Sequence, residues 1–470
     1  MHIIGNAQTD IKSIEYDSRK VSEGALFFCI SGYKTDGHNY AQNAVEAGAA
    51  ALMVTRKLDI NVPQILVDDA RMAMAHISRE FYGRPDETLK MIGITGTNGK
   101  TTTTYMIKSV LECTGKKTGL IGTIINMIGD RELHAERTTP ESPDLFALLR
   151  RMADDGCKAA VMEVSSHSLE LGRTSGITFD VSVFTNLTQD HLDFHQTFEN
   201  YLNAKKKLFC ASKQAAVNID DNAAADIMAV DIDWRTFGIK EKADVYARNI
   251  EITPKGVTYD LCCQGAMLPL HLRIPGIFSV YNSLAAATAC LILGEGLEAI
   301  KKGLEAMPSV AGRFEVLDTG SRPFTIILDY AHTPDSLQNT LMTVKSFARG
   351  RIIPVFGCGG DRDRGKRPIM GEIAGRLSSF AVITSDNPRT EDPFEIIRSV
   401  ESGMKKTDCP YICIENRRAA IKYAIDNAQS EDIIVLAGKG HETYQEIGNV
   451  KYPFDEKKVV KELLYEVTKE

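Results

Sequence analysis

The segment from Gly93 to Thr102 has residue types and spacing that suit the binding of phosphate groups. It reads Gly-Ile-Thr-Gly-Thr-Asn-Gly-Lys-Thr-Thr, follows an apolar stretch and runs into a pattern typical of a helix. Glycines let backbone N–H groups approach an anion, and a helix N-terminus adds the positive end of its dipole. The lysine can reach β- and γ-phosphates, and the threonine hydroxyl after it can hold Mg²⁺. Although the usual pattern has a glycine at the position of Ile94, we expect ATP to bind at Gly96, Thr97, Asn98, Gly99, Lys100, Thr101 and Thr102.

Two further polar segments belong to the same part of the chain. Glu163 lies at the end of the strand-like stretch Ala159–Val164, where its carboxylate can complete the coordination of Mg²⁺ that Thr101 begins. The stretch Asp190–His195 packs two acids and two histidines into six residues. Its residue types suit metal ligation, contacts with phosphates, or a polar loop with one structural histidine, and the stretch alone does not decide between them.

The C-terminal part of the chain has four polar segments that each follow an expected strand. In an open α/β sheet, ligands bind outside the carboxyl ends of the strands. A cleft lined by these segments has charges of both signs, which suits an amino acid with its ammonium and carboxylate groups. The four segments are Asp329–Pro334, Gly357–Asp363, Asp386–Arg389 and Gly438–Glu442. They follow the expected strands 324–329, 351–356, 381–384 and 432–437, and a helix is expected to start near Pro334.

The elements that must position these residues alternate between strand-like and helical patterns. This alternation predicts an α/β architecture of mostly parallel sheets with helices on both faces. A chain of 470 residues is too long for one hydrophobic core. We expect three domains, at residues 1–88, 89–318 and 319–470; the second has the phosphate-binding segment and the third has the charged cleft.

The composition excludes several classes of function. A net charge of −7 gives no electrostatic footprint for a nucleic-acid partner. The ten cysteines are scattered without the spacing of a zinc site, which fits a reducing cytosol. The N-terminal residues lack the pattern of a signal peptide, and the longest apolar runs are too short to span a bilayer. We therefore expect a cytoplasmic protein without membrane insertion.

Taken in order, these motifs resemble those of the Mur ligases, a family of peptidoglycan synthesis. The resemblance extends from Asp17 to Glu442, and Ile94 is normal for this family. It implies a three-domain α/β fold with a central, P-loop ATPase-like parallel sheet and a C-terminal Rossmann-like domain. Within the family, the pattern is most similar to the ligase that adds the third residue of the stem peptide. The matching motifs are Thr95–Thr102, Glu163–His167, Asp190–Asp193, Ala204-Lys205, Gly312-Arg313, Asp329–Pro334 and Gly438–Glu442.

The resemblance also implies a mechanism in which ATP phosphorylates a substrate carboxylate and an amine then displaces the phosphate. Lys100 and Thr101 would bind phosphates and Mg²⁺, Glu163 would ligate Mg²⁺, and His191 would ligate a second Mg²⁺. Lys205 would be carbamylated, because CO₂ turns its ammonium, a poor neighbour for Mg²⁺, into an anion. The nucleotide would also contact Asn282, Arg313 and Asp329.

The implied substrates are a UDP-N-acetylmuramoyl dipeptide (UDP-MurNAc-dipeptide) and a diamino acid. The UDP end would meet Ser18, Tyr33, Lys34 and Thr35, and the sugar and peptide would meet Thr138, Thr139, Ser165 and Arg173. We expect meso-diaminopimelate rather than lysine, because the planar fork of Arg389 can take the second carboxylate that lysine lacks. The pocket would be completed by Arg362, Asp386, Asn387, Pro388, Gly438 and Glu442, with Glu442 facing the far ammonium.

Three alternatives stay open at this stage. A lysine-adding ligase would share every motif outside the amino-acid pocket. A folylpolyglutamate synthase also activates a carboxylate with ATP, but it would lack the N-terminal segments Asp17–Arg19 and Gly32–His38. A P-loop NTPase switch would hydrolyse ATP without acceptor substrates, and it would leave the charged cleft without a purpose. We expect the protein to be a monomer.

Overall fold

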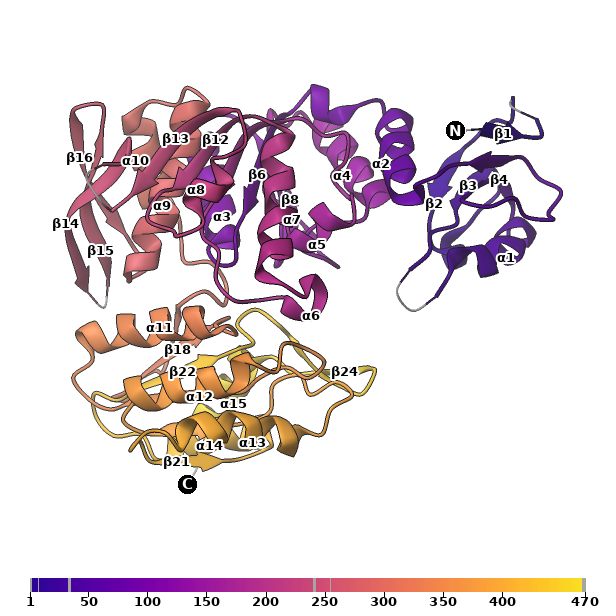
Figure 1. Cartoon of the computed structure of the whole chain (residues 1–470). Coiled ribbons are helices and arrows are strands. Elements are labelled where there is room, and N and C mark those ends of the chain that lie inside the picture. The colour runs from indigo at the N-terminus through magenta and orange to yellow at the C-terminus, as the bar shows by residue number, and fades with distance from the viewer. Residues whose placement is uncertain (1, 7, 33–34, 240–241, 254, 467–470) are drawn as a thin grey trace. The chain divides into compact units, whose positions relative to one another are not determined.

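We analysed a computed structural model that describes residues 2–6, 8–32, 35–239, 242–253 and 255–466. The chain divides into two compact units. The first consists of Met1–Gly93, Lys116–Val181 and Lys207–Lys213, and the second of Ile94–Gly115, Ser182–Lys206 and Gln214–Glu470. The described strands form sheets of five, eleven, six and two strands (Figure 1). The predicted α/β class is confirmed.

The N-terminal sheet of the first unit has the order β1-β5-β4-β3-β2, and all neighbours except β1 are parallel. Its two faces are covered by different helices because side chains alternate along a strand. Phe28 packs with Met74 of α2 on one face, and Phe27 packs with Ala44 of α1 on the other. The elements are β1 (His2–Ile4), β2 (Ser13–Glu15), η1 (Ser18–Lys20), β3 (Ala25–Phe28), η2 (Gly37–Tyr40), α1 (Ala41–Glu46), β4 (Ala49–Val54), β5 (Gln64–Leu66), α2 (Ala70–Phe81) and η3 (Pro85–Glu87).

The rest of the first unit contributes the order β10-β7-β8-β9 to the eleven-stranded sheet. β10 and β7 are parallel, whereas β7, β8 and β9 follow one another as antiparallel hairpins. The elements are β7 (Thr118–Ile121), β8 (Ile125–Ile128), β9 (Arg131–His134), α4 (Ser142–Asp154), β10 (Ala159–Glu163) and α5 (Ser166–Glu170). Four elements have residues in both units: β6 (Lys90–Thr95), β11 (Phe179–Phe184), α7 (Phe198–Cys210) and β12 (Ser212–Asn218).

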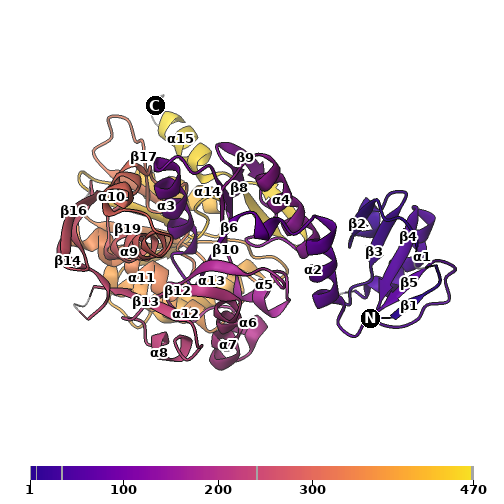
Figure 2. The ribbon, with the colours of Figure 1, turned by 90° about the horizontal axis from the view of Figure 1, so that it is seen from above.

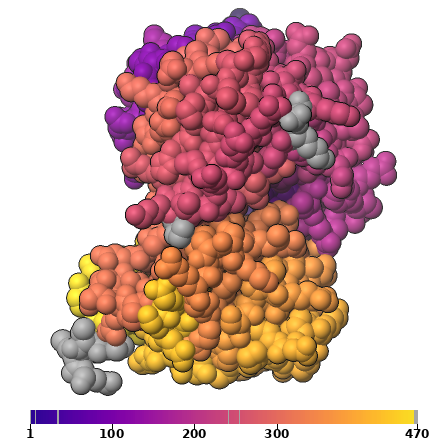
Figure 3. Space-filling model, turned by 90° about the vertical axis from the view of Figure 1, so that its left-hand side faces the viewer, coloured from indigo at the N-terminus to yellow at the C-terminus, as the bar shows by residue number. Residues whose placement is uncertain are grey.

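The second unit contributes the order β16-β15-β14-β13-β12 to the same sheet. β12, β13 and β14 are parallel, and β14, β15 and β16 form an antiparallel extension that the sequence did not predict. This extension forms part of the surface seen in Figure 3. The elements are α3 (Lys100–Cys113), α6 (Leu192–His195), β12 (Ser212–Asn218), α8 (Ala224–Ile227), β13 (Asp233–Gly238), β14 (Val245–Thr253), β15 (Gly256–Cys263), β16 (Ala266–Leu272), α9 (Ile277–Ile292) and α10 (Leu297–Ala306).

The C-terminal sheet has the order β17-β18-β22-β19-β20-β21, and only β17 is antiparallel. α14 and α15 cover the face opposite to α11, α12 and α13 (Figure 2). Its elements are β17 (Glu315–Leu317), β18 (Thr325–Asp329), α11 (Pro334–Phe347), β19 (Ile352–Phe356), α12 (Lys366–Leu377), β20 (Ala381–Ile383), α13 (Pro393–Met404), β21 (Tyr411–Cys413), α14 (Arg417–Asp426), β22 (Ile433–Ala437) and α15 (Glu456–Glu466). A separate hairpin is formed by β23 (Tyr444–Ile447) and β24 (Val450–Pro453).

The parallel order brings the carboxyl ends of β18, β19, β20 and β22 to one edge of this sheet, as predicted. Each of these strands is an apolar run that is buried along nearly its whole length. Among the described residues, no helix is long and apolar enough to cross a membrane.

Candidate functional site

The phosphate-binding loop connects β6 to α3, and its glycines are required by its geometry. Gly96 has φ 149°, and a Cβ atom there would lie 1.9 Å from the Thr185 hydroxyl oxygen. Gly99 has φ 86°, and a Cβ atom there would lie 2.3 Å from Asn282 Oδ1. Lys100 folds back over the loop and donates from Nζ to two loop carbonyl oxygens, of Gly96 and Thr97, each at 2.8 Å. The loop therefore has the backbone conformation and the cation that a phosphate site needs.

The polar segment after β11 holds this loop in place. The Thr185 hydroxyl donates to the carbonyl oxygen of Asn98 at 2.7 Å, and the N–H of Asn98 donates to Asn186 Oδ1 at 2.9 Å. The N–H of Thr188 donates to the hydroxyl oxygen of Thr97 at 3.0 Å. The segment Thr185–Thr188 therefore stabilises the conformation of the phosphate-binding loop.

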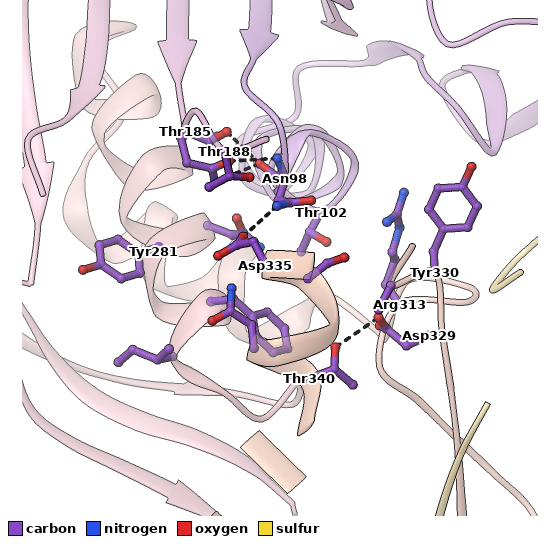
Figure 4. A pocket seen from close by; sticks show the side chains of 18 of the residues that line it. Asn98, Thr102, Thr185, Thr188, Tyr281, Arg313, Asp329, Tyr330, Asp335 and Thr340 are labelled. Carbon is purple, nitrogen blue, oxygen red and sulfur yellow. Dashed lines mark hydrogen bonds between the residues drawn. The ribbon is translucent and has the colours of Figure 1, made fainter. Parts of the chain in front are cut away.

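A cavity of about 320 Å³ adjoins the loop within the second unit. Aromatic rings, amides and carboxylates line it together, a combination that can stack on a planar base and hydrogen-bond its edge. The cavity contains Asn98, Gly99 and Thr102 of the loop and all three further residues expected to contact a nucleotide, Asn282, Arg313 and Asp329. Figure 4 shows Arg313, Asp329 and Tyr330 on one side of it and Tyr281 on the other. Other lining residues are Asn186, Asn218, Asp221, Phe237, Phe278, Asp335 and Asn339.

Arg313 extends from the turn before β17 to the start of α3. Its Nη2 donates to the Thr101 hydroxyl at 3.1 Å, and its guanidinium lies 4.6 Å from the centre of the Tyr330 ring. Asp329 fixes the turn by accepting from the N–H of Phe314 at 2.6 Å. Burial raises the pKa of Asp329, while the cation of Arg313 opposes this shift. Arg313 is therefore placed to meet phosphate groups bound at the loop.

A cluster of charged groups surrounds Lys205, which lies on α7 and is 1% exposed. Burial and the nearby cation of Lys100 hold the pKa of Lys205 well below its usual range, although Asp190 opposes them. The Lys205 Nζ atom lies 4.5 Å from the centre of the Tyr201 ring. Burial therefore favours the uncharged amine, which is the form that a reaction with CO₂ requires.

Asp190 is the anion of this cluster. Its Oδ2 lies 3.2 Å from His191 Nε2 and 3.9 Å from His332 Nε2, and its Oδ1 lies 3.8 Å from Lys366 Nζ. Burial acts to raise the pKa of Asp190, but these neighbours outweigh it and hold the pKa below its usual range. Burial and Lys366 lower the pKa of His332 to about 4, so this imidazole is neutral at pH 7. Among the described residues, no group of three acidic, histidine or cysteine side chains forms a ready metal site.

The first unit contains Glu163, which is expected to bind Mg²⁺, and the residues expected to contact the sugar and peptide of the substrate. Glu163 is 1% exposed at the end of β10, and its two carboxylate oxygens accept from the N–H and the hydroxyl of Thr123 at 2.8 and 3.0 Å. The Thr139 hydroxyl donates to the carbonyl oxygen of Glu163 at 2.8 Å and accepts from the N–H of Ser165 at 3.1 Å. Arg173 donates from Nη1 to the carbonyl oxygen of Thr139 at 3.0 Å.

The structure thus brings together Thr139, Ser165, Arg173 and Glu163, and it links Thr138 to them through Thr123 at 3.0 Å. The residues expected at the UDP end are less connected. Ser18 lies in η1 and Thr35 is exposed before η2, and within the described part of the chain no hydrogen bond joins either to Thr139. Tyr33 and Lys34 lie outside the described residues.

The charged cleft at the C-terminal sheet is organised by a lysine that sequence reasoning missed. Lys439 is fully buried, and its Nζ donates to the carbonyl oxygen of Tyr444 at 2.7 Å and to Asn387 Oδ1 at 3.0 Å. The same atom lies 3.3 Å from Asp386 Oδ1 and 3.5 Å from Glu442 Oε2. Lys439 therefore joins the segment after β20 to the segment after β22. The sequence has no local signal that this side chain is buried, because its partners come from separate segments of the chain.

Three of the expected pocket residues, Asp386, Asn387 and Glu442, contact this lysine directly. Asn387 donates from Nδ2 to Glu442 Oε2 at 2.9 Å. Burial and the neighbouring Asp386 raise the pKa of Glu442, whereas Lys439 and Arg417 overcome burial and lower that of Asp386. Arg389 follows Pro388 and pairs with Glu446, a second residue that the sequence did not single out. Arg362 lies apart from these contacts, with its Nη1 4.0 Å from Asp193 Oδ2.

Comparisons with known proteins find relatives along nearly the whole chain. Three family models match the chain: "Mur ligase family, catalytic domain" at residues 10–82, "Mur ligase middle domain" at 94–290 and "Mur ligase, glutamate ligase domain" at 312–440. A UDP-N-acetylmuramoyl-L-alanyl-D-glutamate–2,6-diaminopimelate ligase of Clostridium acetobutylicum is 50% identical over 99% of this chain and 97% of its own. The ligase of the same name from Caldanaerobacter subterraneus is also 50% identical, with the same coverage of both chains.

Solved structures are similar over nearly the whole chain. A structure of a UDP-N-acetylmuramoyl-L-alanyl-D-glutamate–2,6-diaminopimelate ligase has a TM-score of 0.69 and 33% identity, and the match covers 97% of this chain and 95% of that one. The Thermotoga maritima MurF ligase, solved with ADP, has a TM-score of 0.69 at 18% identity, covering 99% of this chain and all of that one, which supports the fold alone.

Proposed function

This chain belongs to the Mur ligase family, and we propose that it joins meso-diaminopimelate to UDP-N-acetylmuramoyl-L-alanyl-D-glutamate in the cytoplasm, with ATP cleaved to ADP and phosphate. The observation that carries the proposal is 50% identity, over 99% of the chain, to a ligase named for this reaction. The match of residues 10–82 to a Mur ligase domain argues against a folylpolyglutamate synthase, because such an enzyme lacks this block. The charged cleft argues against an NTPase switch, which needs no acceptor.

The second unit would bind and activate ATP. The base would lie in the cavity with Asn282, the phosphates would lie on the loop at Lys100 and Thr101, and Arg313 would stabilise the transferring phosphoryl group. The substrate carboxylate would attack the γ-phosphorus and ADP would leave. The neutral amine of the diamino acid would then attack the acyl carbon to form the C–N bond. The C–O bond to phosphate would break, and the nitrogen would release a proton to solvent. The chain contributes mainly positioning and neutralisation of charge.

We propose that Thr101, Glu163, His191 and carbamylated Lys205 hold Mg²⁺, which when bound neutralises the charge of the phosphates. The burial of Lys205, which lowers its pKa and favours the uncharged amine, supports this assignment. The lysine nitrogen would form a bond to the carbon of CO₂, one C=O π bond would open onto oxygen, and the nitrogen would release a proton to solvent. The product is an anion at a position where an ammonium would repel the metal.

The UDP-MurNAc-dipeptide would contact Thr138, Thr139, Ser165 and Arg173, with the UDP end at Ser18, Tyr33, Lys34 and Thr35. The diamino acid would lie between Arg362, Asp386, Asn387, Pro388, Arg389, Gly438 and Glu442. We propose further that the protein is a monomer; light scattering of the purified protein would test this.

The decisive experiment measures phosphate release from ATP with and without UDP-MurNAc-dipeptide and diaminopimelate. Release that requires both acceptors supports the ligase, and equal release in their absence refutes it. Replacing diaminopimelate by L-lysine at equal concentration tests the choice of amino acid, and a preference for lysine would overturn that part of the proposal.

A further inference from the structure

A carboxylate of this chain already holds Arg389. Arg389 donates from Nε to Glu446 Oε2 at 3.0 Å and from Nη1 to the carbonyl oxygen of Gly360 at 2.8 Å. Both side chains of the pair are largely buried, with 20% of Arg389 and 26% of Glu446 exposed. No hydrogen bond links Nη2 to any residue that the structure describes. The protein itself therefore orients the guanidinium and leaves Nη2 able to donate to a ligand.

The backbone reinforces this arrangement. Arg389 has φ 48°, in the left-handed region that residues with a Cβ rarely adopt. Its N–H donates to the carbonyl oxygen of Glu446 at 3.1 Å, and its own carbonyl oxygen accepts from the N–H of Gly448 at 2.7 Å. The hairpin of β23 and β24 thus fixes Arg389 through both of its backbone polar groups as well as through its side chain.

The Glu446 side chain has no other hydrogen-bond partner among the described residues. Its carboxylate accepts only from Arg389, while its backbone N–H donates to Asn387 Oδ1 at 2.9 Å. Asn387 in turn contacts Glu442 and Lys439. Glu446 therefore connects the expected carboxylate end of the amino-acid pocket to its expected ammonium end.

We propose that Glu446 is a positioning residue for substrate specificity: it holds Arg389 so that Nη2 is left to donate to the second carboxylate of the diamino acid. The inference rests on the proposed function and adds a residue to its site. The Glu446 carboxylate also partly neutralises Arg389 in the free enzyme. Lysine is then rejected chiefly because it leaves a buried donor unpaired, a penalty that typically exceeds the loss of an apolar contact.

The test compares Glu446→Ala and Glu446→Gln with the wild type in steady-state kinetics. Loss of a hydrogen bond to a charged group should raise KM for diaminopimelate about tenfold in Glu446→Ala, with kcat and KM for ATP changed less than about twofold. Glu446→Gln keeps an acceptor oxygen of the same shape, so its KM should stay within about threefold of the wild type. Glu446→Gln also removes the negative charge, so Arg389 should repel an ammonium more strongly in this variant. The variant should therefore prefer diaminopimelate over lysine more strongly than the wild type does.

Glu372→Gln is the matched control, since Glu372 pairs with Arg376 on the surface of α12 and should leave all constants unchanged. An unchanged KM for diaminopimelate in Glu446→Ala, or equal effects of Ala and Gln, overturns the inference. If Glu446→Ala fails to fold, an unchanged diaminopimelate-to-lysine preference in the isosteric Glu446→Gln overturns it instead. If the wild-type enzyme does not use diaminopimelate, the proposed function itself is refuted. If the wild type uses diaminopimelate and both Glu446 variants behave like it, only the role of Glu446 is refuted.

Discussion

Replacing Lys439 by methionine should destabilise the C-terminal sheet and impair the amino-acid pocket together. The substitution keeps a long, flexible side chain of similar volume, so it removes the charge while creating little cavity. Asp386, Asn387 and Glu442 then lose the cation that they share. The aspartate is the critical partner, because its carboxylate stays buried beside the site of the lost charge.

The magnitude follows from the distance between the two charges. At 3.3 Å and an effective dielectric constant near 20, the attraction between Lys439 and Asp386 is about 5 kcal/mol. Breaking a buried pair by removing one partner typically costs about 3–5 kcal/mol. Arg417 also lowers the pKa of Asp386 and remains in the variant, so we expect a loss at the lower end, about 3 kcal/mol.

The loss of folding free energy in Lys439→Met should depend on pH, and the direction of this dependence follows from the pKa of Asp386. The pKa of Asp386 is lowered in the folded protein, so its stabilisation is present above the unfolded pKa and fades as the pH falls through the folded value. Protonated Asp386 needs no counter-charge. The difference in free energy of unfolding between the variant and the wild type should therefore be largest near neutral pH and narrow as the pH falls below about 4.

Urea denaturation followed by circular dichroism measures this difference, and titration of diaminopimelate measures the effect on the pocket. Lys405→Met is the control, because Lys405 pairs with Glu401 at the same 3.3 Å but is 63% exposed. A surface pair of this kind should contribute less than about 1 kcal/mol. Equal losses in the two variants would refute the reasoning, and so would a destabilised Lys439→Met whose affinity for diaminopimelate matches the wild type.

Three further predictions concern the nucleotide side of the site. Lys205→Ala should abolish ligase activity and remove a carbamate ¹³C signal that the wild type shows under ¹³CO₂; a wild-type spectrum without that signal contradicts the assignment. Gly99→Ala places a Cβ 2.3 Å from Asn282 Oδ1 at φ 86°, so calorimetry should show ATP binding weakened at least about tenfold, and an unchanged Kd would mean that the loop is not the phosphate site. Burial lowers the pKa of His332 from 6.5 to about 4, so the unfolded state binds more protons between these pH values and the melting temperature should rise with pH across that window. His332→Gln should flatten this slope, and an equally steep slope in the variant would contradict the prediction.

Much of the fold was predictable because its central strands are continuous apolar runs. The expected strands at 324–329, 351–356, 381–384 and 432–437 agree with β18, β19, β20 and β22 to within a residue at each end, and the helix expected near Pro334 begins there. The antiparallel hairpins were not predicted because their strands are half-polar and lack a continuous apolar run. Their two-residue turns, Gln264-Gly265 and Gly448-Asn449, were signals of hairpins that could have been used.

The site was predictable where its residues follow strands and was not where a hairpin folds over it. Asn282, Arg313 and Asp329 were expected from motifs far apart in the sequence, and they line one cavity with the phosphate loop. Lys439 was passed over because its chemistry depends on Tyr444 and Asp386, which only the folded hairpin and the parallel register bring to it. Glu446 was invisible for the same reason, since a glutamate on a short exposed-looking strand has no distinctive local pattern.

The contact between Arg389 and Glu446 also changes how a preference for diaminopimelate is explained. An isolated guanidinium about 4 Å from a lysine ammonium would repel it by roughly 4 kcal/mol at an effective dielectric constant near 20. With the Glu446 carboxylate 3.0 Å from Nε, much of that repulsion is cancelled before any substrate binds. Discrimination must then rest on the direction of the remaining donors: Nε and Nη1 each already donate one hydrogen bond within the protein, and a second carboxylate on the substrate can accept from Nη2, whereas the ammonium end of lysine cannot. Such a pocket rejects lysine by leaving a donor unpaired, and it can do so while remaining close to neutral overall.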